Sequence, residues 1–349
     1  MTAASVRALP FGDTPEGPAE LLLLEGPELQ LGVSTLGAAV HRLRPRWGSA
    51  DGRDADGPDL VLGLPDAAAA FADDCYVGAT VGRYANRIAQ ARLPLDGRTH
   101  RLEANDGPHA LHGGRVGFNR RLWRVTEVQQ GPAASVRMEL TSPDGDMGFP
   151  GALDAVATFT VDGWSVRVEL MATASAPTVV NLTQHAYWNL TGTAGDVRGH
   201  EVRVAASHYL PVDDDGIPTT GPVAVAGTDL DRRAGGVLRT VRGGVFDHCM
   251  LLDDPGLDAP QMTVREPGGG WSLDISTDAP AVQLYTGAAL TGRYAAYDGL
   301  CLETQWLPDT PRHEGEAGWP TTVLRPGETW RSTTIWRIGP PSDWAQRRP

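Results

Sequence analysis

Side chains that bind hydroxyl groups or move protons are concentrated between Asn181 and Gly192. The stretch combines amide, hydroxyl, imidazole, phenol and indole groups. An imidazole titrates near neutral pH, so His185 can give or take a proton there. In an extended conformation, side chains alternate between two faces, which places His185 beside Thr183 and Tyr187. The other interpretation is a core histidine whose hydrogen bonds are satisfied by its neighbours.

Further reactive side chains stand in unusual surroundings. Glu303 follows Leu300-Cys301-Leu302, and an unpaired charge on an apolar strand is costly, so we expect Glu303 to be paired or used in a reaction. His112 precedes two glycines, which let a ligand or the backbone come close. Asn86 and Arg87 offer an amide and a guanidinium, which suit the binding of hydroxyl groups. The alternative for Arg87 is an ordinary surface ion pair.

Common metal and nucleotide motifs do not account for these residues. His109 and His112 are three positions apart, yet no HExxH motif is present and the flanking Asn, Gly and Pro oppose a helix. The glycine-rich segment 76–89 lacks both GxxxxGK[ST] and a strand-to-helix GxGxxG. We therefore expect no metal, no nucleotide and no other cofactor.

Composition and periodicity predict an all-β fold that positions these groups. The 349 residues include 42 Gly and 27 Pro, and strong helical periodicity is scarce. Apolar residues alternate clearly at 136–140 and 166–170, and we expect more strands at 200–205, 262–265, 271–276 and 332–338. A short helix is expected at 65–71 with Asp66 as its cap, and a hairpin around Asp96-Gly97. No repeat marks a boundary, so 1–349 is predicted to form one domain.

Charge and cysteine content bound the partners and the compartment. The net charge of −13 argues against nucleic acid and against an anionic membrane surface. Cys75, Cys249 and Cys301 show no CxxC spacing, which favours a reducing cytoplasm. We expect no signal peptide and no membrane anchor, because no apolar run is long enough.

Taken together in their order, the motifs resemble those of the aldose 1-epimerase (galactose mutarotase) family. The resemblance covers roughly residues 20–338. The residues that carry it are Asn86-Arg87, Leu111-His112-Gly113-Gly114, the stretch 181–192, Tyr209-Leu210-Pro211-Val212-Asp213, Ile217-Pro218-Thr219, Phe246-Asp247-His248, Val282-Gln283-Leu284-Tyr285-Thr286-Gly287, Leu302-Glu303-Thr304-Gln305, Pro308-Asp309 and Leu324-Arg325-Pro326-Gly327-Glu328.

The resemblance implies a large twisted antiparallel β-sandwich, a supersandwich like that of galactose mutarotase, with a sugar site on its concave face. It implies interconversion of the α and β anomers of a free aldose such as galactose or glucose. We expect a monomer or homodimer, and the sequence does not decide between them. By position, Glu303 matches the general base, His185 the general acid and His112 the second active-site histidine. The implied sugar-binding residues are Asn86, Arg87, Asp247 and Gln283.

Anomer exchange requires only proton transfers, which accounts for these residue types. A base takes the proton of the anomeric hydroxyl while an acid protonates the ring oxygen, the ring opens, C1–C2 rotates, and closure reverses the transfers. We expect the two groups on opposite sides of the sugar. Asp247 is expected to orient His185 or Arg87 if it lies near them.

Several features leave the substrate, and in part the function, open. The segments 47–58 and 312–320 depart from the family pattern and are expected to alter the mouth of the pocket. Arg115, Arg120 and Arg121 allow an alternative phosphorylated sugar, and a hemiacetal natural product is another. A sugar-binding protein without turnover is the alternative from a different class. Trp188 is either a core residue or a cover for an apolar sugar face.

Overall fold

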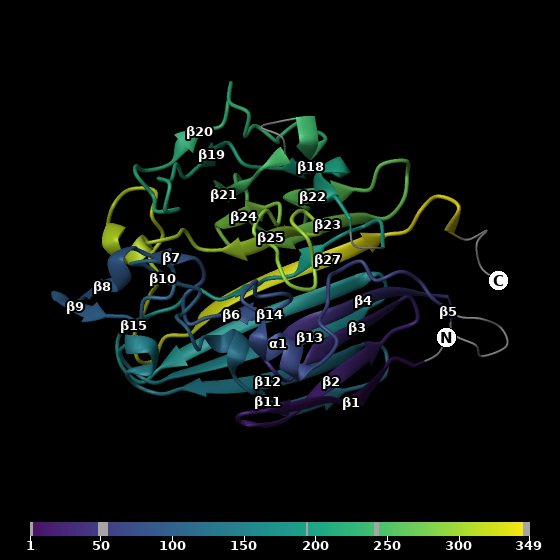
Figure 1. The fold of residues 1–349 in the computed structure, drawn as a ribbon, viewed down its shortest axis with the longest axis horizontal. Helices are drawn as coiled ribbons and strands as arrows, with labels where there is room; N and C mark the ends of the chain where they lie inside the picture. The colour runs from purple at the N-terminus through teal and green to yellow at the C-terminus, as the bar shows by residue number, and fades with distance from the viewer. Residues whose placement is uncertain (1–2, 48–54, 193–194, 241–243, 345–349) are drawn as a thin grey trace.

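Alternating apolar side chains build three main antiparallel sheets, which lie in two layers (Figure 1). The structure is a computed structural model that describes residues 3–47, 55–192, 195–240 and 244–344. Within these residues strands dominate, and the predicted all-β sandwich is confirmed.

The first layer is an eight-stranded sheet. Its strands, in spatial order, are β11 (Arg124–Gln129), β12 (Ala134–Ser142), β13 (Leu153–Asp162), β14 (Ser165–Ala174), β27 (Trp330–Gly339), β23 (Ser272–Thr277), β22 (Met262–Arg265) and β18 (Glu201–Val204). In β13 every second side chain is fully buried, from Leu153 to Val161. The other face of this strand is partly exposed, as the period-2 pattern requires.

The second layer consists of two sheets. The five-stranded sheet runs β1 (Ser5–Thr14), β2 (Gly17–Glu25), β3 (Leu29–Ser34), β4 (Ala39–Trp47) and β5 (Ala55–Asp56). The six-stranded sheet runs β17 (Tyr187–Trp188), β25 (Leu300–Gln305), β24 (Ala281–Tyr285), β21 (Asp247–Leu251), β19 (His208–Tyr209) and β20 (Val223–Ala224).

Short pairs and turns connect the layers. The two-stranded pairs are β7 (Arg87–Ile88) with β10 (Ala110–Leu111), β6 (Thr80–Val81) with β16 (Thr183–Gln184), β8 (Arg92–Leu95) with β9 (Arg98–Arg101), and β15 (Thr178–Val179) with β26 (Val323–Leu324). The helical elements are α1 (Ala67–Ala72) and the 3₁₀ turns η1 (Ala89–Ala91), η2 (Phe118–Arg120), η3 (Asp146–Gly148), η4 (Val197–Gly199), η5 (Leu238–Thr240) and η7 (Thr310–His313).

One large apolar core fills the space between the layers. It joins buried residues of β2–β4, β12–β14, β22–β25 and β27. Trp188 belongs to this core, where its ring centroid lies 5.0 Å from that of Trp336 in an edge-to-face contact. Of the two interpretations of Trp188, the core residue is therefore the one that the structure supports.

Most local predictions are confirmed. Asp66 caps α1, because its side chain accepts the backbone N–H of Ala69 at 2.8 Å. The hairpin around Asp96-Gly97 is β8–β9, and strands occur at the four further positions expected from alternation. The predicted loop 47–58 falls mostly on 48–54, outside the described residues, and its end forms β5. No helix in the described ranges has the length and apolar character needed to cross a membrane.

Candidate active site

Glu303 and Gln283 face each other across neighbouring strands of the six-stranded sheet. They are register partners in the β24–β25 ladder, and Cys249 of β21 pairs with Gln283 on its other side. Both are almost fully buried. The Nε2 amide of Gln283 donates to Oδ1 of Asp247 at 2.6 Å. Asp247 is thus bound by Gln283, whereas the carboxylate that binds the guanidinium of Arg87 is Asp106. The expectation that Asp247 orients His185 or Arg87 stays a prediction.

His185 lies at a break between two short strands. Residues before it pair with β6, and residues after it pair with β25, so 181–192 is not the single strand that alternation suggested. The backbone N–H of His185 donates to Ala79 at 2.8 Å, and its carbonyl accepts from Gly78 at 3.0 Å. Its ring lies beside Tyr187, as predicted, with ring centroids 5.0 Å apart.

The imidazole of His185 reaches the carboxyl group of Glu303. Nε2 and Oε1 are 3.5 Å apart, and both side chains are buried. The structure therefore places the two groups side by side. Their position on opposite sides of a bound sugar stays a prediction. Because the anomeric hydroxyl and the ring oxygen are both bonded to C1, one neighbouring acid and base can address both atoms.

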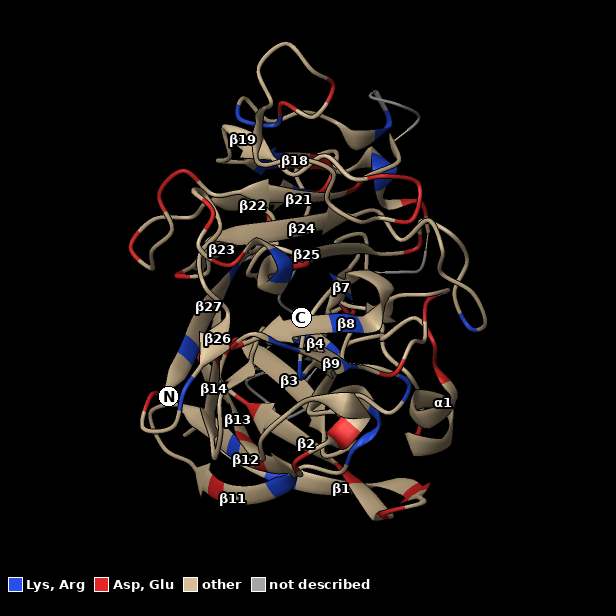
Figure 2. Ribbon diagram, turned by 90° about the vertical axis from the view of Figure 1, so that its left-hand side faces the viewer, with Lys and Arg blue, Asp and Glu red and all other residues tan. Residues whose placement is uncertain are grey.

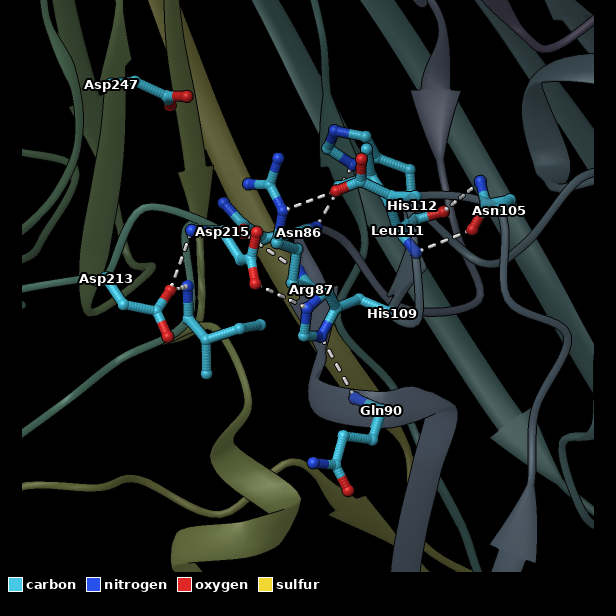
Figure 3. Close-up of polar contacts among 12 residues, drawn as sticks. Asn86, Arg87, Gln90, Asn105, His109, Leu111, His112, Asp213, Asp215 and Asp247 are labelled. Carbon is cyan, nitrogen blue, oxygen red and sulfur yellow. Dashed lines mark hydrogen bonds and ion pairs between the residues drawn. The ribbon is translucent and has the colours of Figure 1, made fainter.

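Asn86 and His112 flank the β7–β10 pair, Asn86 just before β7 and His112 just after β10, and they fix each other (Figure 3). The backbone N–H of Asn86 donates to Nδ1 of His112, and the backbone N–H of His112 donates to the carbonyl of Asn86, each at 3.1 Å. Both residues have left-handed backbones, with φ of 64° and 52°. Gly113 is required beside them, since a Cβ there would lie 2.0 Å from the carbonyl oxygen of Gly82.

Arg87 is held by an acid that the sequence did not single out. Its Nε donates to Oδ2 of Asp106 at 2.7 Å. The turn 213–217 covers the guanidinium, because a Cβ on Gly216 would lie 2.7 Å from Nη1 of Arg87. Asp213 closes this turn by accepting the backbone N–H groups of Asp215 and Ile217 (Figure 3).

A cavity of about 170 Å³ brings all seven sequence-predicted site residues together. Its lining includes the predicted set Asn86, Arg87, His112, His185, Asp247, Gln283 and Glu303. It also includes aromatic side chains not predicted as site residues, namely Tyr76, Tyr187 and Tyr285. A second hollow of about 400 Å³ adjoins it, since Arg87 and Asp247 line both. Arg312 lines neither hollow, so the start of the 312–320 segment lies away from Glu303.

Burial sets the protonation of the central groups. It raises the pKa of Glu303 well above the usual range, with a further rise from the charge of Asp247. Burial lowers the pKa of His185 to about 4, and it lowers that of His112 as well, with help from His185 and Arg87. Burial thus favours the uncharged forms of both Glu303 and His185.

The site suits a metal ion poorly, although three possible ligands converge. The ligand atoms of His112, His185 and Glu303 lie within 4.8 Å of one another. Nδ1 of His112 accepts a backbone N–H, so the proton of the neutral ring sits on Nε2. A metal on Nε2 would need that proton to move to Nδ1, where it would face the N–H of Asn86.

Other sequence candidates have structural roles elsewhere. His109 accepts the backbone N–H of Gln90 at 3.1 Å and lies beside Asp215, outside the cavity of Glu303 (Figure 3). Arg115, Arg120 and Arg121 do not line that cavity, and each is paired with a carboxylate. Tyr76 was missed because nothing in its sequence surroundings places its ring 4.6 Å from that of His112.

Comparisons with known proteins identify the family. The aldose 1-epimerase family model matches residues 20–337. A galactose mutarotase of Rattus norvegicus is 36% identical over 96% of this chain and 98% of its own length, and an aldose 1-epimerase of Escherichia coli is 38% identical over 75% and 80%. A crystal structure of an aldose epimerase homologue from C. elegans has a TM-score of 0.81 at 26% identity, over 97% of this chain and 100% of that one. The chain therefore belongs to the aldose 1-epimerase family, whose members are isomerases.

Proposed function

We propose that this chain interconverts the α and β anomers of a free aldose such as galactose or glucose. The observation that carries the proposal is the buried His185–Glu303 pair, with 3.5 Å between Nε2 and Oε1, in a cavity whose lining also includes amide, guanidinium, carboxylate, imidazole and phenol groups. A sugar offers an anomeric hydroxyl and a ring oxygen to such a pair. The named activities of the relatives support the same reaction.

Glu303 acts as the base and His185 as the acid. The proton of Glu303 first moves to Nε2 of His185, which gives a carboxylate and an imidazolium. The carboxylate then takes the proton of the anomeric hydroxyl, and the imidazolium gives its Nε2 proton to the ring oxygen as the C1–O bond breaks. The open aldehyde rotates about C1–C2. When the ring closes again, Glu303 returns its proton to O1. The hydroxyl formed from the ring oxygen gives its proton back to Nε2 of His185. Each transfer contributes about 10²–10⁴-fold to the rate.

His112 serves as a fixed hydrogen-bond donor to the sugar. Because the backbone of Asn86 occupies its Nδ1, the neutral ring presents Nε2–H to the cavity. Asn86, Arg87, Gln283 and Asp247 supply further partners for hydroxyl groups. His112 is fixed as an Nε2–H donor by the backbone of Asn86, whereas Nε2 of His185 lies beside Glu303. This difference supports His185, and not His112, as the proton-transfer group.

The alternatives receive less support. A phosphorylated sugar would need unpaired guanidinium groups at the cavity, and the three candidate arginines are engaged with Glu103, Asp74, Glu16 and Asp146. A binding protein without turnover needs hydroxyl partners but no buried acid and base. A hemiacetal natural product would use the same acid and base.

The cellular setting stays a prediction. We expect a cytoplasmic monomer or homodimer with a small-molecule sugar as its ligand and no nucleic-acid partner. The three free cysteines support a reducing compartment. Basic and acidic residues are scattered over the strands and loops in Figure 2, which gives no support to a nucleic-acid surface in that view.

Polarimetry tests the reaction. Freshly dissolved α-D-galactose and α-D-glucose are expected to reach their equilibrium rotation faster with the protein than in buffer alone. The same assay with the 6-phosphates of both sugars examines the phosphorylated alternative. Acceleration with the phosphates alone would contradict the free-aldose assignment.

A further inference from the structure

The two histidines of the cavity differ in what meets their outer nitrogen. Nδ1 of His112 meets a backbone N–H, which can only donate. Nδ1 of His185 meets the Sγ atom of Cys301 at 3.5 Å. A thiol can donate its S–H or accept an N–H at sulfur. The tautomer of His185 therefore depends on how this thiol is used.

The sheet brings Cys301 to His185. Cys301 lies two residues before Glu303 on β25, so both side chains point to the same face of the strand. Its register partners are Tyr187 on one side and Tyr285 on the other. The side chain is completely buried. The strand thus delivers Glu303 to Nε2 of His185 and Cys301 to Nδ1 of the same ring.

Proton exchange at Nε2 requires a particular tautomer. After the imidazolium gives its Nε2 proton to the ring oxygen, the neutral ring keeps the proton on Nδ1. During ring closure the sugar hydroxyl gives a proton back to Nε2, which must therefore be unprotonated. In both states Nδ1–H needs an acceptor, because an unpaired buried N–H is costly. The sulfur of Cys301 lies 3.5 Å from Nδ1, and the backbone carbonyl of His185 itself is a second acceptor for the ring.

We propose that Cys301 is a positioning residue whose sulfur accepts the Nδ1–H of His185, so that Nε2 can exchange a proton with Glu303 and with the sugar. The link to the sugar rests on the proposed function. The link between Cys301 and the tautomer of His185 does not. Burial raises the pKa of the thiol well above its usual value, so Cys301 stays neutral and does not compete for the proton.

Several groups besides Cys301 face the ring of His185. Glu303 lies 3.5 Å from Nε2. The rings of Tyr187, His112 and Tyr76 lie at centroid distances of 5.0, 5.4 and 6.0 Å. The phenols are neutral near pH 7, and burial keeps His112 neutral. Glu303 is the one partner among these that changes charge during the proposed reaction.

Nitrogen-15 NMR of the ring nitrogens tests the tautomer directly. We expect neutral His185 of the wild type to carry its proton on Nδ1. In Cys301→Ala the sulfur is gone, so at alkaline pH, where Glu303 is ionised and accepts a hydrogen bond, the proton is expected to move to Nε2. In Cys301→Ser the hydroxyl oxygen accepts Nδ1–H, which keeps the Nδ1–H tautomer and raises the pKa of His185 above the wild-type value.

Cys249→Ala is the matched control. Cys249 is also buried and free, on β21 of the same sheet, but it packs in a separate cluster with Leu210 and Leu307. Cys301→Ala is expected to lower kcat about 10-fold, the equivalent of one hydrogen bond, with little change in KM. Cys301→Ser restores most of kcat, and Cys249→Ala leaves both the tautomer and kcat unchanged.

The outcomes separate this proposal from the proposed function. A wild-type proton on Nε2, an unchanged tautomer in Cys301→Ala, or an equal loss in Cys249→Ala would each overturn the role of Cys301. If Cys301→Ala does not fold, Cys301→Ser still tests the role of Cys301. A pKa of His185 in Cys301→Ser that is not above the wild-type value would then overturn it. If the wild type does not accelerate mutarotation, the function fails while the NMR comparison remains valid.

Discussion

Asn86 and His112 hold each other in left-handed backbone conformations through two hydrogen bonds of 3.1 Å. One of these bonds uses Nδ1 of the imidazole, which is why the ring can present only Nε2–H to the cavity when neutral. The same contact therefore shapes the backbone and fixes the chemistry of the side chain. The two roles can be separated by substitution.

His112→Asn is expected to keep stability and lose activity. The carbonyl oxygen of Asn can take the place of Nδ1 and accept the N–H of Asn86, and Asn tolerates a positive φ. The Nε2–H donor is lost, which lowers kcat/KM by about 10²-fold, as for other preorganised donors. His112→Val is the companion variant. Its branched side chain suits φ of 52° badly, so its Tm should be the lower of the two. Equal Tm values would argue against the backbone role.

Glu303→Gln is expected to stabilise the folded protein at alkaline pH. Burial raises the pKa of Glu303, so between 4.5 and the folded-state pKa the native protein holds a proton that the unfolded chain releases. Stability therefore falls as pH rises through this window, and the Gln variant avoids that loss. Thermal unfolding should show a higher Tm for the variant at about pH 8, by roughly 1–2 °C per kcal/mol.

The two unfolding curves of that comparison should converge below pH 4.5, where Glu303 is protonated in both states. A variant that is less stable than the wild type at alkaline pH would contradict the burial argument. So would a Tm difference that is the same at every pH.

His41 is expected to make the protein sensitive to acid. It is buried, its Nδ1 accepts the backbone N–H of Leu64 at 3.2 Å, and burial lowers its pKa from 6.5 to about 4. Between these values the unfolded chain binds more protons, so stability falls as pH drops from 6.5 towards 4. Urea unfolding of His41→Asn should show a shallower loss over this range. An unchanged slope would contradict the prediction.

Asp106→Asn is expected to weaken sugar binding more than turnover. The carboxylate of Asp106 holds the guanidinium of Arg87 at 2.7 Å, and Arg87 is proposed to bind hydroxyl groups away from the bond that breaks. KM should rise about ten-fold, in line with about 1.5 kcal/mol for a hydrogen bond between charged groups, while kcat changes less. Asp96→Asn is the control, because it removes an exposed Asp–Arg pair on the β8–β9 hairpin. A comparable KM change in both variants would contradict the role of Asp106.

Alternation carried most of the fold prediction. Strands such as β13 and β14 bury every second residue, so their period is visible in the sequence. The stretch around His185 misled that reasoning, since both faces are buried there and the chain changes partners from β6 to β25 at the histidine. The expectation of one domain over 1–349, with a core at about 20–338, stays a prediction.

The site residues were predicted from the order of short motifs along the chain and not from hydrophobic periodicity. Glu303 was visible as a carboxylate on an apolar strand, and His185 as an imidazole in a polar run. The contributions of Cys301 and Asp106 were not, because a thiol next to leucines looks like a core residue and an Asp before a Gly looks like a turn. Their contacts with His185 and Arg87 depend on pairing between distant segments.

The most direct test of the central claim is polarimetry of fresh α-D-galactose with the wild type, Glu303→Gln and Glu127→Gln side by side. Glu127 lies on the exposed face of β11, so its variant controls for the loss of a carboxylate as such. We expect the wild type and Glu127→Gln to accelerate the change in rotation equally, and Glu303→Gln to lose at least about 10²-fold. Near-normal acceleration by Glu303→Gln would show that this carboxylate is not the base.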